Sequence, residues 1–160
     1  MPKCYNIFMK SAIETILALS DKLSNYTVEE SSEELDKLRR KYKVPTKDGK
    51  TFNRSTGMIA GKLRSAGLDR GKWIAPGSQR ARYSALSKAG CGNWKCGFLM
   101  VEDGNLKYPF ISASGKAMVS GIYAAKRRAV QSGETAVVDI TNKVLKLIEK
   151  DLERKKKAKK

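Results

Sequence analysis

The sequence predicts a mostly helical α+β fold in which N- and C-terminal helices surround a small central β-hairpin region. Apolar residues recur at helical spacings of three and four near both ends of the chain. Glycine and proline dominate residues 67–97, and apolar segments flank the turn at residues 102–105. With 160 residues, the chain suffices for one ordinary domain or two small ones, which excludes a large multidomain enzyme.

The first two expected helices precede a turn that contains a proline. An apolar stripe predicts a helix over residues 11–24. Ser31 followed by Glu34 is a capping-box pattern, which begins a second helix with an apolar inner face. The segment 44–49 ends this helix, because proline disfavours helix in the residue before it and Asp-Gly favours a turn.

A third helix is expected from about residue 55 to residue 66, with Gly67 as its left-handed C-cap. Residues 72–75 and 81–85 lie on either side of the turn signal Pro76-Gly77-Ser78, which favours a pair of short strands.

A second hairpin is more strongly marked. Residues 96–101 and 106–111 flank a turn whose aspartate, glycine and asparagine tolerate positive φ. Two helices then close the chain: Ser114 is expected to cap the first, which Gly133 ends. A wide apolar stripe predicts the second over residues 134–153.

The chain divides by composition into four regions. These are an acidic N-terminal helix (1–30), a basic region (31–95), a hairpin with two helices (96–153) and a basic tail (154–160). The tail carries six positive charges in seven residues, which repel one another and predict a disordered arm.

The charge balance indicates a polyanionic partner. The 33 Lys and Arg residues against 16 Asp and Glu residues give a net charge of +17. Residues 36–100 hold sixteen basic residues and three acidic ones, so most of the excess lies there. Such a basic stretch is typical of contacts with nucleic-acid phosphates.

Composition also excludes several classes of protein. The chain has no histidine, which removes the catalytic pairs and zinc sites that depend on this residue. Its three cysteines, Cys4, Cys91 and Cys96, are too few for a disulfide-stapled secreted scaffold. Cys91 and Cys96 either pair, bind a metal or remain as thiols, and we expect no cofactor or metal. Without an apolar run of membrane-spanning length, we expect an intracellular protein with no membrane partner.

Residues 37–83 resemble a winged helix-turn-helix DNA-binding module. A basic helix, a turn, the helix 55–64 and a basic hairpin follow one another in the order of that module. The resemblance implies that the start of the second helix enters a DNA groove, where Asn53 and Arg54 would contact base edges. The connection 44–54 is longer than the usual turn, and the same residues also suit sequence-tolerant phosphate binding.

The predicted nucleic-acid contacts come from this region and the tail. They are Arg39, Arg40, Lys41, Asn53, Arg54, Ser55, Thr56, Lys62, Arg64, Lys72, Arg80, Arg82, Lys155, Lys156 and Lys157. Trp73, Tyr83 and Trp94 are interleaved with basic residues, so they either stack on bases or anchor the core.

Catalysis finds little support in the sequence. The segment 57–63 is one residue short of a phosphate-binding loop, and carboxylates are sparse in the basic region. Tyr83 beside Arg80 and Arg82 is a candidate nucleophile on a single short segment. We therefore expect no enzyme and predict no catalytic residue.

The resulting hypothesis is a non-enzymatic protein that binds nucleic acid, duplex DNA before RNA, through phosphate contacts of the central region and the tail. Residues 103–110 with the helix 117–131 are similar to short modules in proteins of phages and large DNA viruses. This similarity favours the alternative, a structural component of a virion or nucleoprotein particle, such as a minor capsid or genome-packaging protein that contacts other subunits. The expected location is the nucleoid, the nucleus or the virion.

Overall fold

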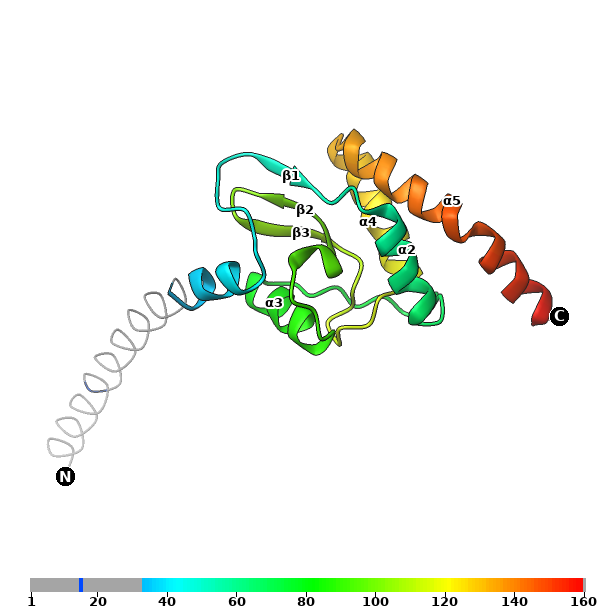
Figure 1. Cartoon of the computed structure of the whole chain (residues 1–160), viewed down its shortest axis with the longest axis horizontal. Coiled ribbons are helices and arrows are strands. Elements are labelled where there is room, and N and C mark those ends of the chain that lie inside the picture. Colours follow the sequence, from blue (N-terminus) through cyan, green and yellow to red (C-terminus); the bar gives the residue numbers. More distant parts are fainter. Residues whose placement is uncertain (1–14, 16–32, 160) are drawn as a thin grey trace, which may run out of the picture. The chain divides into compact units, whose positions relative to one another are not determined.

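The computed structural model describes Thr15 and residues 33–159, which belong to two compact units, Met1–Lys37 and Leu38–Lys160 (Figure 1). In the first unit, Thr15 and residues 33–37 are helical. The rest of the predicted helix 11–24 lies outside the described residues, as does the capping residue Ser31. The mostly helical α+β class is confirmed, because a three-stranded antiparallel sheet is combined with long helices in the described part of the chain.

The sheet is built around β2 (Phe98–Glu102), with β1 (Lys50–Phe52) on one side and β3 (Asn105–Pro109) on the other. Both pairings are antiparallel. The predicted second hairpin is confirmed as β2–β3, and its turn residues Asp103 and Gly104 have φ values of 51° and 79°. Sequence analysis does not predict β1, because three residues are too few to show alternation.

The predicted third helix is confirmed as α2 (Thr56–Ser65). Gly67 follows it with φ of +85° and donates its N–H to the carbonyl of Arg64 at 2.9 Å. The N–H of Leu68 donates to the carbonyl of Leu63 at 2.8 Å. These two bonds form a Schellman motif, which satisfies carbonyl groups at the end of the helix.

The predicted first hairpin is wrong. Residues 72–75 form no strand, and residues 81–85 lie within a helix, α3 (Gln79–Lys88). Ser78 caps this helix, because its Oγ accepts the N–H of Ala81 at 3.0 Å. The alternation over five residues is short enough to fit either structure, whereas Tyr83 and Leu86, three residues apart, share the buried face of a helix.

The helix α4 (Val119–Ser132) ends at Gly133, whose φ of +71° confirms the predicted stop. Its start is later than predicted, because Ser114 lies in a turn instead of capping the helix. That turn is closed by a bond from the N–H of Ser112 to the carbonyl of Lys116, at 2.8 Å.

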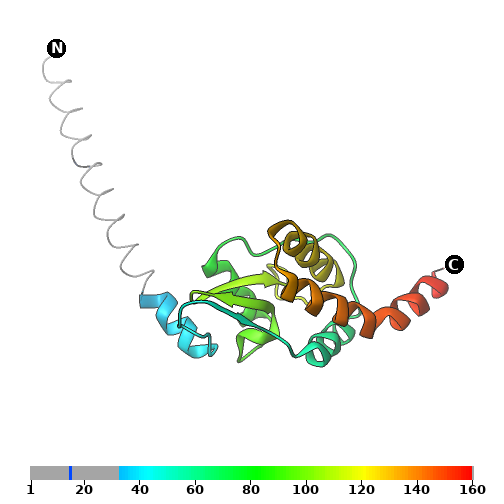
Figure 2. The ribbon, with the colours of Figure 1, turned by 90° about the horizontal axis from the view of Figure 1, so that it is seen from above.

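The last helix, α5 (Thr135–Ala158), packs beside α4 and α2 (Figures 1 and 2). It continues through Ala158, whereas sequence analysis predicts a disordered arm over residues 154–160, of which the last lies outside the described residues. Lysine and alanine are good helix formers, and cations are favourable at the C-terminal end of a helix. The Nζ of Lys155 also donates to the carbonyl of Gly67, which ties this end of α5 to the end of α2.

The core is centred on β2, whose residues from Phe98 to Val101 are all buried. Because neighbouring residues of a strand point to opposite faces, both faces of the sheet are covered. The helices α3 and α4 contact β3, and α5 contacts β2. The rings of Tyr42 and Tyr83 stack with centroids 5.9 Å apart, and both residues are buried.

Asn53, directly after β1, connects three segments of the core. Its side chain is fully buried. The amide nitrogen donates to the carbonyls of Lys95 at 2.8 Å and Phe98 at 3.0 Å, and the amide oxygen accepts the N–H of Ser55 at 3.2 Å. Its backbone N–H donates to the carbonyl of Leu99 at 2.8 Å. Asn53 therefore fixes the start of α2 against the start of β2.

We expect Asn53→Ala to lower the free energy of unfolding by about 2–4 kcal/mol, because one buried and one partly buried carbonyl lose a donor and one N–H loses its acceptor. Urea denaturation followed by circular dichroism measures this loss. The matched control is Asn93→Ala, which removes one bond, from the N–H of Lys95 to the side chain at 3.0 Å, and should lose about 1 kcal/mol. Equal losses would contradict the central position of Asn53.

Two glycine substitutions should change stability in opposite directions. A methyl group at Gly97 would lie 2.5 Å from Cδ1 of Ile111, which is itself buried, so Gly97→Ala should destabilise the fold by about 1–3 kcal/mol. Gly61 lies inside α2, and no atom of another segment is within 4 Å of the position that a Cβ would take there. Gly61→Ala should therefore stabilise the fold by about 0.5–1 kcal/mol. Thermal denaturation of the two variants gives the signs, and a stable Gly97→Ala protein would refute the packing argument.

Candidate nucleic-acid interface

The fifteen predicted contact residues fall into groups that differ in what their side chains do. Six use their side-chain nitrogens within the fold: Arg39, Asn53, Lys62, Arg64, Arg82 and Lys155. Seven are exposed and make no side-chain hydrogen bond or ion pair within the described part of the chain: Arg40, Lys41, Arg54, Ser55, Lys72, Lys156 and Lys157. Thr56 is the half-buried first residue of α2, and Arg80 is exposed on α3.

The proposed base-reading position at the start of α2 is corrected by the structure at Asn53. A fully buried amide whose oxygen and nitrogen bond to the backbone cannot also bond to an adenine edge. Arg54 and Ser55 beside it remain exposed, and the guanidinium of Arg54 lies 5.6 Å from the ring centroid of Phe52. This junction presents one cation and one hydroxyl, a pair suited to phosphate oxygens.

Near the end of α2, several predicted cations stabilise the fold. The Nε of Arg64 donates to Oδ2 of Asp151 at 2.9 Å, and its Nη2 donates to the carbonyl of Leu147 at 2.8 Å. The Nζ of Lys62 lies 3.8 Å from the Sγ of Cys91. Since these nitrogens hold α2 against α5 and a neighbouring loop, the exposed lysines that follow in α5, Lys156 and Lys157, are the better candidates for external anions.

The two described cysteines, Cys91 and Cys96, lie close to one another beside Lys62. Cys91 and Cys96 are free. Burial raises the pKa of the Cys91 thiol to about 11, and the neighbouring Cys96 adds to this shift while Lys62 opposes it. The Cys91 thiol is therefore protonated at neutral pH and a weak nucleophile. Within the described residues, Cys, Asp and Glu nowhere gather in a group of three that would hold a metal ion.

The three aromatic residues that are candidates for stacking on bases differ in their exposure to solvent. Tyr83 and Trp94 are each 2% exposed and belong to the core, whereas Trp73 is half-buried. Burial raises the pKa of Tyr83, and the guanidinium of Arg39 partly opposes this effect. A buried, protonated phenol is poorly placed for nucleophilic attack. Of these three rings, Trp73 is the one that a ligand can reach.

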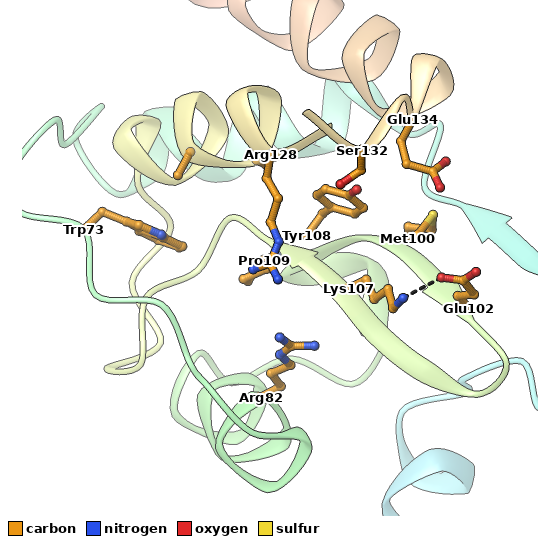
Figure 3. A pocket seen from close by; sticks show the side chains of 12 residues that line it. Trp73, Arg82, Met100, Glu102, Lys107, Tyr108, Pro109, Arg128, Ser132 and Glu134 are labelled. Carbon is orange, nitrogen blue, oxygen red and sulfur yellow. Dashed lines mark hydrogen bonds and ion pairs between the residues drawn. The ribbon is translucent and has the colours of Figure 1, made fainter. Parts of the chain in front are cut away.

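Trp73 lines a pocket of about 270 Å³ between α3, α4 and the β2–β3 hairpin. In Figure 3, Arg82 from α3 and Arg128 from α4 point toward one another across this pocket, and Trp73 lies to one side. The side chain of Arg82 donates to the carbonyls of Pro76, at 3.2 Å, and Leu106. Burial lowers the pKa of Arg82, and the positive charge of Arg128 lowers it further.

The carboxylates of this pocket are already paired with lysines. Glu102 lies 2.5 Å from the Nζ of Lys107, and Glu134 pairs with Lys50. Within the described part of the chain, neither Arg82 nor Arg128 has a carboxylate partner. We call this site the arginine pocket. The guanidinium groups of Arg82 and Arg128 carry like charges, and Arg82 is partly buried. An anion between the two groups is therefore favourable.

A second pocket, of about 430 Å³, also has Trp73 in its wall. Arg70 and Arg127 line it, and the guanidinium of Arg70 lies 5.5 Å from the ring centroid of Tyr123. The Oγ of Ser120 is buried in the wall and has no hydrogen-bond partner within the described residues. We call this site the Ser120 pocket.

Among the basic residues of these two pockets, sequence reasoning missed four: Arg70, Lys107, Arg127 and Arg128. The consecutive residues Lys126, Arg127 and Arg128 interrupt an otherwise apolar and small-residue helix, which is a local signal for a basic site. Their convergence with α3 and the loop at Trp73 depends on tertiary contacts that no local pattern specifies.

None of the helices in the described part of the chain combines the length and apolar character that a membrane span needs. Comparison of the chain with protein-family models, with curated proteins and with solved structures finds no match.

Proposed function

We propose that this protein binds nucleic acid without catalysing a reaction, mainly through contacts between its cations and backbone phosphates. The observation that carries this proposal is the arginine pocket, where two guanidinium groups converge with no carboxylate partner in the described part of the chain. Guanidinium pairs match the geometry of phosphate oxygens and retain their charge at all physiological pH values.

The exposed cations extend this phosphate-binding surface. Arg40 and Lys41 follow one another at the end of a helix, Arg54 precedes α2, and Lys156 and Lys157 lie near the end of α5. None of these five makes a hydrogen bond or ion pair to a side chain of the described residues. Cations of this kind contact phosphates whatever the base sequence, so we propose sequence-tolerant binding. Duplex DNA is the first ligand to test, and RNA is the second.

The salt dependence of binding tests the proposal. If about five phosphates are contacted, the slope of log K against log salt concentration should be about −5 for duplex DNA, because each contact releases condensed counterions. Fluorescence anisotropy of labelled duplex DNA, single-stranded DNA and RNA over a range of salt gives the slope. A slope near zero, or no binding at low salt, would overturn the proposed function.

The basic end of α5 provides a second test. The double variant Lys156→Gln, Lys157→Gln should reduce the magnitude of the salt slope by about two units on duplex DNA, since two phosphate contacts are lost. It should fold normally, because both side chains are exposed. The matched control is Lys143→Gln, Lys146→Gln, which removes the same charge from exposed positions in the middle of α5. Equal effects of the two variants would show that net charge, not this end of the helix, determines binding.

A further inference from the structure

The ring of Trp73 is held against α4 by a glycine. A Cβ atom at Gly121 would lie 2.6 Å from Cζ3 and 2.7 Å from Cη2 of the indole, so only glycine at this position allows the ring to approach the helix so closely. The ring nevertheless lines both the arginine pocket and the Ser120 pocket. It is therefore rigidly seated on one side and accessible on others, as a stacking platform for a planar ligand must be.

Cations line both of the pockets to which this ring contributes. Arg82 and Arg128 line the arginine pocket, and Arg70 and Arg127 line the Ser120 pocket. Because Arg127 and Arg128 are consecutive in α4, their side chains leave the helix in different directions and serve different pockets. Each of the two pockets therefore combines the indole of Trp73 with two arginine side chains.

Polar groups in both the arginine pocket and the Ser120 pocket are available to bind a ligand. Arg127 and Arg128 make no hydrogen bond or ion pair within the described part of the chain. The Oγ of Ser120 is buried without a partner there, and a buried hydroxyl in this state is normally satisfied by a ligand or water. Met100, Tyr108 and Pro109 add apolar wall to the arginine pocket. Its volume of about 270 Å³ suits one small group, such as a phosphate.

We propose that Trp73 and its two flanking pockets bind an unpaired nucleotide of a nucleic-acid strand. The base contacts the indole of Trp73, the phosphate on one side lies between Arg82 and Arg128, and the phosphate on the other lies near Arg70 and Arg127. In a duplex, each base is stacked and paired, so it cannot reach a ring set between two pockets. The inference rests on the proposed function and narrows it to strands that expose at least one base.

Binding of three nucleic-acid probes to the wild-type protein and to three variants of the full chain tests this inference. The probes are an oligothymidylate of about eight nucleotides, an abasic strand of the same length and a blunt duplex. Trp73→Leu should weaken oligothymidylate binding about tenfold or more, which is the contribution of one base stacked on one aromatic ring, and should leave the abasic strand unchanged. Arg128→Gln should weaken both single strands, because it removes a phosphate contact. The control, Lys146→Gln, removes one charge from the exposed part of α5 and should have a smaller effect on both.

Tryptophan fluorescence adds a readout that does not depend on the variants. Oligothymidylate should quench the emission of the wild-type protein, and Trp73→Leu should abolish the quenching, because Trp94 is only 2% exposed. Circular dichroism of each variant establishes that it is folded. Should Trp73→Leu fail to fold, Arg128→Gln and the wild-type quenching still decide the matter, since Arg128 is exposed and makes no hydrogen bond or ion pair within the described residues.

The outcomes separate the inference from the proposed function. Salt-sensitive binding of all probes, with no quenching and no loss in Trp73→Leu or Arg128→Gln beyond that of Lys146→Gln, would overturn the inference and leave the proposed function standing. A loss in Trp73→Leu that is equal for the duplex and the oligothymidylate would overturn the requirement for an unpaired base. If no probe binds at low salt, both fail.

Discussion

The buried amide of Asn53 is the interaction on which the arrangement of this fold depends. It lies where β1 ends and α2 is about to begin, and it bonds to the backbone on both sides of the turn that leads into β2. These bonds fix the relative positions of segments that are more than forty residues apart in the sequence. Since α5 packs on α2 and contacts β2, the position of the long C-terminal helix follows from the same connection. A single short polar side chain thus connects β1, α2 and β2.

Local signals in the sequence are sufficient where one residue type determines the backbone. Gly67 and Gly133 mark helix ends, and the Asp103–Gly104 turn joins β2 to β3, because each requires positive φ. The signals fail where two structures share a pattern, as at residues 81–85, or where an element is as short as β1. The candidate site is predicted in part: the sequence indicates Arg82 and Trp73, whereas Arg128 becomes a partner of Arg82 only through the packing of α4.

The abundance of positive charge has two separate roles in this chain. One group of cations holds helix ends and carbonyl groups, as Arg64 does between α2 and α5 and Arg39 does at the β2–β3 turn. A second group remains at the surface or in pockets without carboxylate partners in the described part of the chain. Asn53, which sequence analysis predicts to contact bases, is uncharged but also bonds to backbone groups of the fold. Charge and residue type alone therefore could not separate contacts to a ligand from contacts within the fold.

Arg82 belongs to both groups at once. Its guanidinium joins the segment before α3 to β3 through two carbonyls, and it also faces the charge of Arg128. Repulsion between these two arginines opposes the native arrangement, and an anion placed between them removes that repulsion. Ligand binding and folding are therefore thermodynamically linked: an anion that binds the native state alone stabilises it by mass action, by about 2.7 kcal/mol at a concentration of about one hundred times Kd. An anion bound in the arginine pocket should therefore raise the free energy of unfolding of this protein.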